Sequence, residues 1–104
     1  MENKTAQDQI ESLVKANPVF LFMKGTPQFP MCGFSARVIE LLKMHEAQYE
    51  SFNVLEDESV RQGVKDYGNW PTIPQLYIKG ELVGGCDILM EMHEAGELKS
   101  ALAV

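Results

Sequence analysis

Hydrophobic and polar positions along the chain alternate between helical and strand-like patterns. Thr5 and Asp8 have the spacing of a helix start. The apolar stripe that follows ends at Asn17-Pro18, because the residue before a proline is pushed out of the α region. Residues 19–23 then form a nearly unbroken apolar run, which is typical of a central strand covered on both faces.

The next segments predict a β-α-β unit. Residues 24–31 form an expected loop, since Pro27 and Pro30 exclude regular structure there. Apolar residues recur at helical spacing from about residue 34 to residue 45, and a second strand is expected around residues 48–54. A strand, a helix and a strand of these lengths favour a right-handed crossover between parallel strands.

The second half of the chain predicts a helix, a hairpin and a closing helical region. The segments are a helix over residues 57–67 with Gly68 just past its end, a rigid connector over residues 70–74, strands over residues 76–78 and 81–83 around a tight turn at Lys79-Gly80, and a helical region after Gly84-Gly85 that Gly96 breaks. We therefore expect one α/β domain over residues 1–104, with a mixed sheet flanked by helices on both faces.

Composition and charge limit the partners of this domain. The net charge of -6 argues against nucleic acid or an anionic membrane as the main partner, because both are bound through clustered Lys and Arg. Two cysteines are too few for a secreted disulfide scaffold, and Met1–Lys4 lack the basic and apolar regions of a signal peptide. No apolar run approaches the roughly 20 residues of a membrane helix. We expect a cytoplasmic protein.

Candidate chemistry centres on Cys32, between the first strand and the second helix. Unpaired N–H groups and the positive end of the helix dipole favour the thiolate, which attacks disulfides and binds metals, and Lys24 adds a positive charge. Cys32 also lies at the carboxyl end of the first strand, where open α/β sheets carry their ligand sites. Ser35 holds the position of the second thiol in a Cys-x-x-Cys pair. The alternative is a small buried apolar residue.

Residues that could bind a metal are few. An iron–sulfur cluster held by thiolates needs four of them, and this chain has two separated cysteines, Cys32 and Cys86. A cluster would therefore need a second protein chain, outside thiols, or both. His45 and His93 stand singly on helical patterns, and we interpret each as an ordinary surface or core-edge residue.

Two further stretches have the residue types of an anion site. Arg61 and Lys65 share a helix face, which is either a solvated face with Asp57 paired to Arg61 or a site for an anion such as a ligand carboxylate. Gly84-Gly85 opens a helix directly after a strand, so free N–H groups there form an anion site. Asp87 is either the N-cap or an acceptor for a ligand ammonium group, and Cys86 is either a packed small residue or a second thiol.

The connector at residues 70–74 has two interpretations as well. One is a stiff loop with a core aromatic, Trp70. A cis Ile73-Pro74 bond would instead turn the Ile73 backbone outward as an extended edge for a peptide-like ligand. Composition alone gives no reason to predict a cis bond, because X-Pro bonds are cis in only about 5–6% of folded cases.

Four stretches together resemble the monothiol glutaredoxins of the single-domain Cys-Gly-Phe-Ser class. They are residues 23–27 (Met-Lys-Gly-Thr-Pro), 30–35 (Pro-Met-Cys-Gly-Phe-Ser), 70–75 (Trp-Pro-Thr-Ile-Pro-Gln) and 84–87 (Gly-Gly-Cys-Asp). Each motif alone is a weak signal, but the set is highly specific in this order and spacing, over almost the whole chain. The resemblance implies a thioredoxin-like fold with a four-stranded mixed sheet, a cis Pro74 and bound glutathione.

The resemblance also implies roles for individual residues. Cys32 corresponds to the nucleophile and cluster ligand. The glutathione contacts implied are Lys24 and Arg61 on the glycine carboxylate, the Ile73 backbone on the cysteine, and Cys86 and Asp87 on the γ-glutamyl end, with Lys65 beside this set. The family binds a [2Fe-2S] cluster between two subunits through two protein cysteines and two glutathione thiols. Acceptor iron–sulfur apoproteins and a BolA-like protein are the partners implied.

Three hypotheses follow for this chain. The first is a glutathione-dependent homodimer that carries a [2Fe-2S] cluster to apoproteins. The second is a glutathione-dependent thiol–disulfide oxidoreductase that uses Cys32 as its nucleophile, a reaction that needs one protein thiol and free glutathione. The third is a Cys32–Cys86 disulfide that acts as a redox switch.

Overall fold

The computed structural model describes residues 5–104, so Met1–Lys4, on which the expected absence of a signal peptide rests, lie outside the described residues. The elements in chain order are α1 (Ala6–Ala16), β1 (Val19–Met23), α2 (Gly33–Met44), β2 (Glu50–Asn53), the 3-10 helix η1 (Val54–Glu56), α3 (Glu58–Gly68), β3 (Gln75–Ile78), β4 (Glu81–Gly84), α4 (Cys86–Glu94) and α5 (Leu98–Leu102). No helix in this part of the chain is long and apolar enough to cross a membrane. The predicted order of helices and strands is confirmed.

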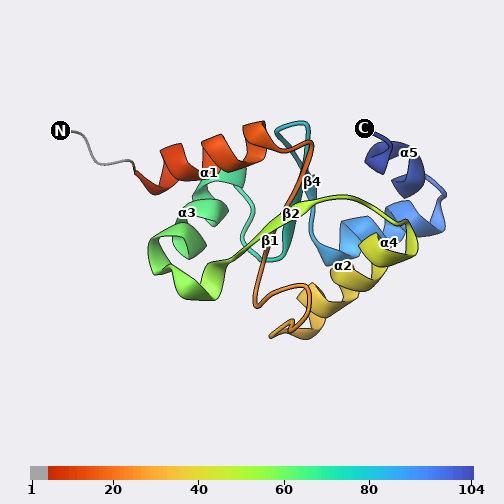
Figure 1. Cartoon of the computed structure of the whole chain (residues 1–104), viewed down its shortest axis with the longest axis horizontal. Helices are drawn as coiled ribbons and strands as arrows, with labels where there is room; N and C mark the ends of the chain where they lie inside the picture. The colour runs from red at the N-terminus through yellow and green to blue at the C-terminus, as the bar shows by residue number, and fades with distance from the viewer. Residues whose placement is uncertain (1–4) are drawn as a thin grey trace.

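The strands described in residues 5–104 form a four-stranded mixed sheet in the order β2-β1-β3-β4. β1 pairs with β2 in parallel and with β3 antiparallel, and β3 pairs with β4 antiparallel. The crossover through α2 therefore joins parallel strands, as the sequence predicts. Figure 1 shows α1 and α3 on one side of the sheet and α2 and α4 on the other, which confirms the predicted α/β fold with helices on both faces.

The core lies in two layers because β1 is buried on both faces. Its side chains alternate, so Leu21 enters the layer under α2 and α4, while Phe22 enters the layer under α1 and α3. All five residues of β1 are buried. Each such Leu or Phe side chain contributes roughly 1.5–3 kcal/mol when it leaves water. This burial fixes β1, and with it the position from which the chain enters the loop before Cys32.

Local side-chain bonds decide where two elements end. The second strand is shorter than expected because Asn53 Oδ1 accepts from Leu55 N (3.0 Å), which starts η1. Helix α3 includes Gly68 rather than ending before it, and Asn69 ends the helix in the left-handed region with φ 51°. Gly68 lies against β3, where a Cβ would come within 2.5 Å of the Tyr77 hydroxyl oxygen. Glycine at this position therefore serves close packing.

Candidate functional site

The loop between β1 and α2 is anchored to both neighbouring elements. Met31 N donates to Lys24 O (2.8 Å), which closes the loop. Gly25 N donates to Asn53 Oδ1 (2.9 Å) at the end of β2, and Lys24 N donates to Ser35 Oγ (3.1 Å) in the first turn of α2. Ser35 is fully buried. The serine in the position of a second thiol therefore holds the loop that leads to Cys32.

Cys32 is the N-cap of α2, and its thiol makes no capping hydrogen bond. Partial burial is the largest influence on the pKa of this thiol and raises it. The N–H groups of Ser35 and Phe34, the Ser35 hydroxyl and the Lys24 ammonium act in the opposite direction, and together they hold the pKa of Cys32 below its ordinary value. The prediction of a thiol favoured as thiolate agrees with this local structure.

Cys32 stands in the wall of a pocket of about 430 Å³. The residues that line it come from the loop before α2, from α2, α3 and the connector after it, and from the start of α4: Lys24, Cys32, Phe34, Lys65, Trp70, Pro71, Thr72, Ile73, Pro74, Gly85, Cys86, Asp87 and Ile88. The pocket thus joins two cations, one carboxylate and an apolar wall around the thiol. An extended peptide-like molecule with opposite charges at its two ends fits this distribution.

The connector between α3 and β3 is hydrogen-bonded to the buried side chain of Gln75. This side chain is fully buried, and its Nε2 donates to Trp70 O (3.1 Å) and Thr72 O (3.2 Å). Tyr77 Oη donates to Gln75 Oε1 (3.0 Å). Ile73 is buried and the Ile73-Pro74 bond is cis, as the resemblance implies. The backbone that lines the pocket is therefore positioned by one polar side chain in the core.

The start of α4 forms another part of the pocket wall, next to the connector. Gly85 is the N-cap of α4, so Asp87 lies in the first turn and is exposed, and the N-cap interpretation of Asp87 is wrong. A Cβ on Gly85 would come within 3.0 Å of Pro74 O, so glycine lets α4 approach the connector. Cys86 is 7% exposed, and burial raises the pKa of its thiol. Cys32 is therefore the better nucleophile of the two free cysteines.

Of the two cations on α3, Lys65 lines the pocket and Arg61 does not. Arg61 lies 4.0 Å from Glu58 Oε1. The expected pairing of Asp57 with Arg61 is wrong, because Asp57 Oδ1 caps α3 by accepting from Ser59 N (3.0 Å) and Val60 N (3.2 Å). The structure thus brings together all the site residues predicted from the sequence except Arg61.

Sequence reasoning did not assign Phe34, Thr72 and Ile88 to the pocket. Phe34 is 63% exposed, although its spacing places it on the apolar stripe of α2. With Phe29 (76%) and Met31 (67%) it belongs to the large apolar side chains that remain exposed. The sequence feature that could have assigned Phe34 to the pocket is its position two residues after Cys32, at the start of a helix that faces a ligand site.

Comparison with protein families and known proteins agrees with this geometry. The Glutaredoxin family model matches residues 19–83. Monothiol glutaredoxin-S11 of Oryza sativa is 58% identical over 91 residues, which cover 88% of this chain and 18% of that protein. An uncharacterized ycf64-like monothiol glutaredoxin of Synechocystis is 49% identical over 102 residues, which cover 98% of this chain and 95% of that protein. The mitochondrial glutaredoxin-related protein 5 of Danio rerio is 52% identical over 103 residues, 98% of this chain and 66% of that protein.

Solved structures give the same result. A monomeric truncated mutant of 1-C-Grx1 from Trypanosoma brucei superposes with a TM-score of 0.84 at 44% identity, covering 97% of this chain and 91% of that chain. A buckwheat glutaredoxin–glutathione complex superposes with a TM-score of 0.83 at 28% identity, covering 93% and 86%. The chain spans about a fifth of the length of the rice relative, so the shared part is the domain described above. The chain belongs to the glutaredoxin family, among its monothiol members.

Proposed function

We propose that this chain, as one glutaredoxin domain over residues 1–104, binds glutathione and carries a [2Fe-2S] cluster between two copies of itself. The observation that carries the proposal is the position of Cys32, whose thiolate is favoured, in a pocket that Lys24, Lys65 and Asp87 also line. Acceptor iron–sulfur apoproteins would receive the cluster. A BolA-like protein is a further proposed partner, on the family resemblance alone.

The pocket suits the charges of glutathione. This tripeptide carries a carboxylate at its glycine end and both an ammonium and a carboxylate at its γ-glutamyl end. Lys24 and Lys65 supply positive charge for the glycine carboxylate, and Asp87 with the first N–H groups of α4 meets the γ-glutamyl end. Ile73 offers its backbone to the central cysteine, whose thiol then lies toward Cys32. The buckwheat relative, solved as a glutathione complex, has the same fold.

The available metal-binding side chains are the reason why we propose two chains and glutathione as the source of the cluster ligands. In residues 5–104 no group of three or more His, Cys, Asp or Glu gathers to hold a metal. Cys32 is partly exposed and Cys86 is buried, so each chain offers one accessible thiolate. Two chains and two glutathione molecules supply the four thiolates that a [2Fe-2S] cluster requires. A cluster with two non-protein ligands can leave the protein readily, which suits a carrier.

Anaerobic reconstitution tests this proposal. Iron, sulfide and glutathione are added to the wild type, to Cys32→Ser and to the matched control Cys86→Ser, and visible absorption, iron content and size are measured. We expect a coloured dimer in the wild type and Cys86→Ser that needs glutathione, and none in Cys32→Ser. A colourless monomer in all conditions would overturn the cluster proposal.

A second experiment separates the two cations of α3. Lys65 lines the pocket, while Arg61 does not. Lys65→Gln is therefore expected to weaken glutathione binding about tenfold, the value of one charge-assisted contact of about 1.5 kcal/mol. Arg61→Gln is the matched control with the same change in net charge. Calorimetric titration with glutathione measures both. Equal losses would show that Arg61 reaches the ligand in solution, as the resemblance implies.

The lowered pKa of the accessible Cys32 thiol favours a second candidate, glutathione-dependent reduction of mixed disulfides. The Cys32 thiolate attacks the glutathione sulfur, forms a Cys32–glutathione disulfide and releases the protein thiolate. The thiolate of one free glutathione then attacks the glutathione sulfur of that disulfide, which forms glutathione disulfide and frees Cys32. In total, the protein–glutathione mixed disulfide and one free glutathione become a protein thiol and glutathione disulfide. A robust glutathione-dependent rate that Cys32→Ser abolishes, without cluster formation, would favour this candidate over the first.

We propose the cytoplasm as the compartment, on the small number of cysteines and the negative charge. The relatives do not share one compartment, because the zebrafish protein is described as mitochondrial. Fusion of the complete chain to a fluorescent protein in its own cells, followed by fractionation, tests this. Recovery of the fusion in an organelle or an exported fraction would refute it.

A further inference from the structure

The two histidines of the chain meet at the end of the molecule away from Cys32. His45 and His93 are 48 positions apart in the sequence, and no other histidine occurs. His45 Nε2 lies 3.0 Å from His93 Nδ1, and the two rings are nearly perpendicular, at 89°. Each histidine is partly buried, as expected of a core-edge residue, but the sequence did not indicate that the two side chains contact each other. They form a defined pair between two helices.

We propose that His45 and His93 form a two-histidine site for a divalent transition metal, of the kind that Ni²⁺ and Cu²⁺ represent. Imidazole is the commonest metal-binding side chain, through either ring nitrogen. As the pair lies, one nitrogen donates a proton to the lone pair of the other. A metal ion would accept one lone pair from each of these two nitrogens once the rings turn about them, which leaves the nitrogens near their present separation. The shared proton would move to the other nitrogen of its own ring. This proposal does not depend on the function of the Cys32 pocket.

The spacing of the two nitrogens favours one coordination geometry. Two metal–nitrogen bonds of about 2.1 Å that meet at about 90° hold their nitrogens about 3.0 Å apart, whereas a tetrahedral angle needs about 3.4 Å. The observed separation is 3.0 Å. Square-planar and octahedral ions use angles near 90°, while structural zinc is tetrahedral. The geometry therefore points to Ni²⁺ or Cu²⁺ rather than to structural zinc.

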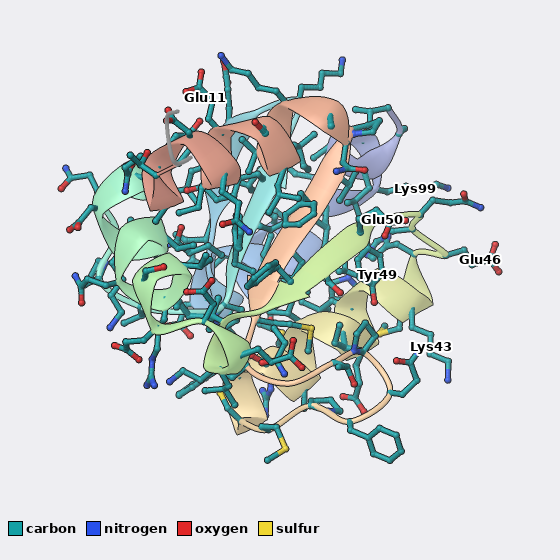
Figure 2. All side chains as sticks on the ribbon, turned by 60° about the vertical axis from the view of Figure 1, so that its left-hand side comes forward. Glu11, Lys43, Glu46, Tyr49, Glu50 and Lys99 are labelled. Atoms are coloured by element: carbon teal, nitrogen blue, oxygen red, sulfur yellow. The ribbon has the colours of Figure 1, made fainter. Side chains whose placement is uncertain are left out.

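The position on the helices also favours a cation. His45 is the C-cap of α2, and His93 lies in the last turn of α4. The partial negative charge at a helix C-terminus attracts cations, and here two helices end side by side. Figure 2 shows Lys43 and Glu46, the charged neighbours of His45 in sequence, pointing out into solvent.

The number of ligands sets the strength of the site. Among residues 5–104 no third His, Cys, Asp or Glu joins the pair to make a group of three. Water would fill the remaining positions, so the site is open and weaker than a structural metal centre. A bound ion would link α2 and α4 at the ends opposite to Cys32 and Cys86, and it would stabilise the fold by mass action as its concentration rises.

Calorimetric titration with Ni²⁺ tests the site, since this ion is not reduced by thiols. The proteins compared are the wild type, His45→Gln, His93→Gln and a Cys32→Ser/Cys86→Ser protein in which no thiol can bind the ion. We expect one Ni²⁺ per chain in the wild type and in the cysteine-free protein, and at least a tenfold loss of affinity in each histidine variant. Equal affinity in wild type and His93→Gln would overturn the proposal, as would no binding by the cysteine-free protein.

Nuclear magnetic resonance gives a second readout that does not depend on the folding of a variant. The chain has two histidines, so every histidine ring ¹⁵N signal belongs to a member of the proposed pair. Substoichiometric Ni²⁺ is expected to broaden or shift both ring signals together in the unaltered protein. Ring signals that stay unchanged while Ni²⁺ binds would show that the pair is only a hydrogen bond between helices, and would overturn the proposal.

Discussion

Replacing Gln75 with leucine keeps the side chain's approximate size and removes its three hydrogen bonds. These bonds join Gln75 to the Trp70 and Thr72 carbonyls and to the Tyr77 hydroxyl. Each bond contributes about 1 kcal/mol on average, so Gln75→Leu should lower the free energy of unfolding by about 3 kcal/mol. Tyr77→Phe removes one of the three and should cost about 1 kcal/mol.

The informative result is the double substitution. In the wild type the Tyr77 hydroxyl has a partner, but in Gln75→Leu it is a buried donor without one, and such a group costs about 1–3 kcal/mol. Adding Tyr77→Phe to Gln75→Leu removes that group and should therefore be neutral or stabilising. We expect a coupling energy of about 1–2 kcal/mol between the two positions.

Urea unfolding of the four proteins measures this cycle. Fluorescence of Trp70, the one tryptophan in the sequence, reports on the connector, and circular dichroism reports on the helices. Coincident transitions would support two-state unfolding, which the energies require. Additive effects of the two substitutions would refute the reasoning, because they would mean that the Gln75–Tyr77 hydrogen bond makes no contribution in solution.

Three further predictions concern the core, the loop and the thiol. Burial raises the pKa of the Tyr77 hydroxyl to about 12 in the folded protein, compared with about 10 in an unfolded chain. The unfolded chain therefore loses this proton at a lower pH than the folded protein does. The stability that the neutral Tyr77 contributes is full below about pH 10 and is lost as the pH rises toward 12. Tyr77→Phe should lose less stability over that interval, as urea unfolding at each pH would show. Gly25→Ala should lower the free energy of unfolding by about 2–4 kcal/mol in the same assay, because φ is 94° at this residue and a Cβ would lie 2.4 Å from a backbone oxygen. Gly33→Ala is the control and should stay near wild type, because a Cβ there would have nothing within 4 Å. Equal effects of the two substitutions would contradict this prediction. Ser35→Ala should raise the pKa of the Cys32 thiol, because it removes the Ser35 hydroxyl that lowers this pKa. The pH dependence of Cys32 alkylation by iodoacetamide measures the pKa. An unchanged value would show that the hydroxyl has no role.

Features encoded by neighbouring residues were predictable from the sequence. Thr5 caps α1 by accepting from Asp8 N (3.1 Å), as their spacing predicts. The apolar run at residues 19–23 became the central strand β1 because each of its residues reaches one of two core layers. The position of Cys32 at a helix start was predictable as well, because a buried strand, a loop with prolines and a helical stripe follow one another along the sequence there.

Features that depend on distant contacts were not predictable in this way. Lys65, rather than Arg61, lines the pocket. The two residues share one face of α3 a turn apart, and periodicity alone does not define which turn of the helix reaches the pocket. Gln75 was noted only as part of a motif, because no sequence pattern indicates that its amide is buried in the core and bonded to the connector. Contact between His45 and His93 requires α2 and α4 to end at the same place, and only the tertiary arrangement brings them there.

The hydrogen bond from the Lys24 N–H to the Ser35 hydroxyl affects how a site with one cysteine could acquire a second. A cysteine at position 35 would place sulfur, a weak acceptor, where the Lys24 N–H now meets a hydroxyl oxygen at 3.1 Å. Residue 35 is fully buried, so water cannot take the place of the hydroxyl oxygen as acceptor for the Lys24 N–H. Gaining a second thiol in this chain would therefore also weaken the bond between the loop and α2. A change in the loop that gives the Lys24 N–H another acceptor would offset that loss.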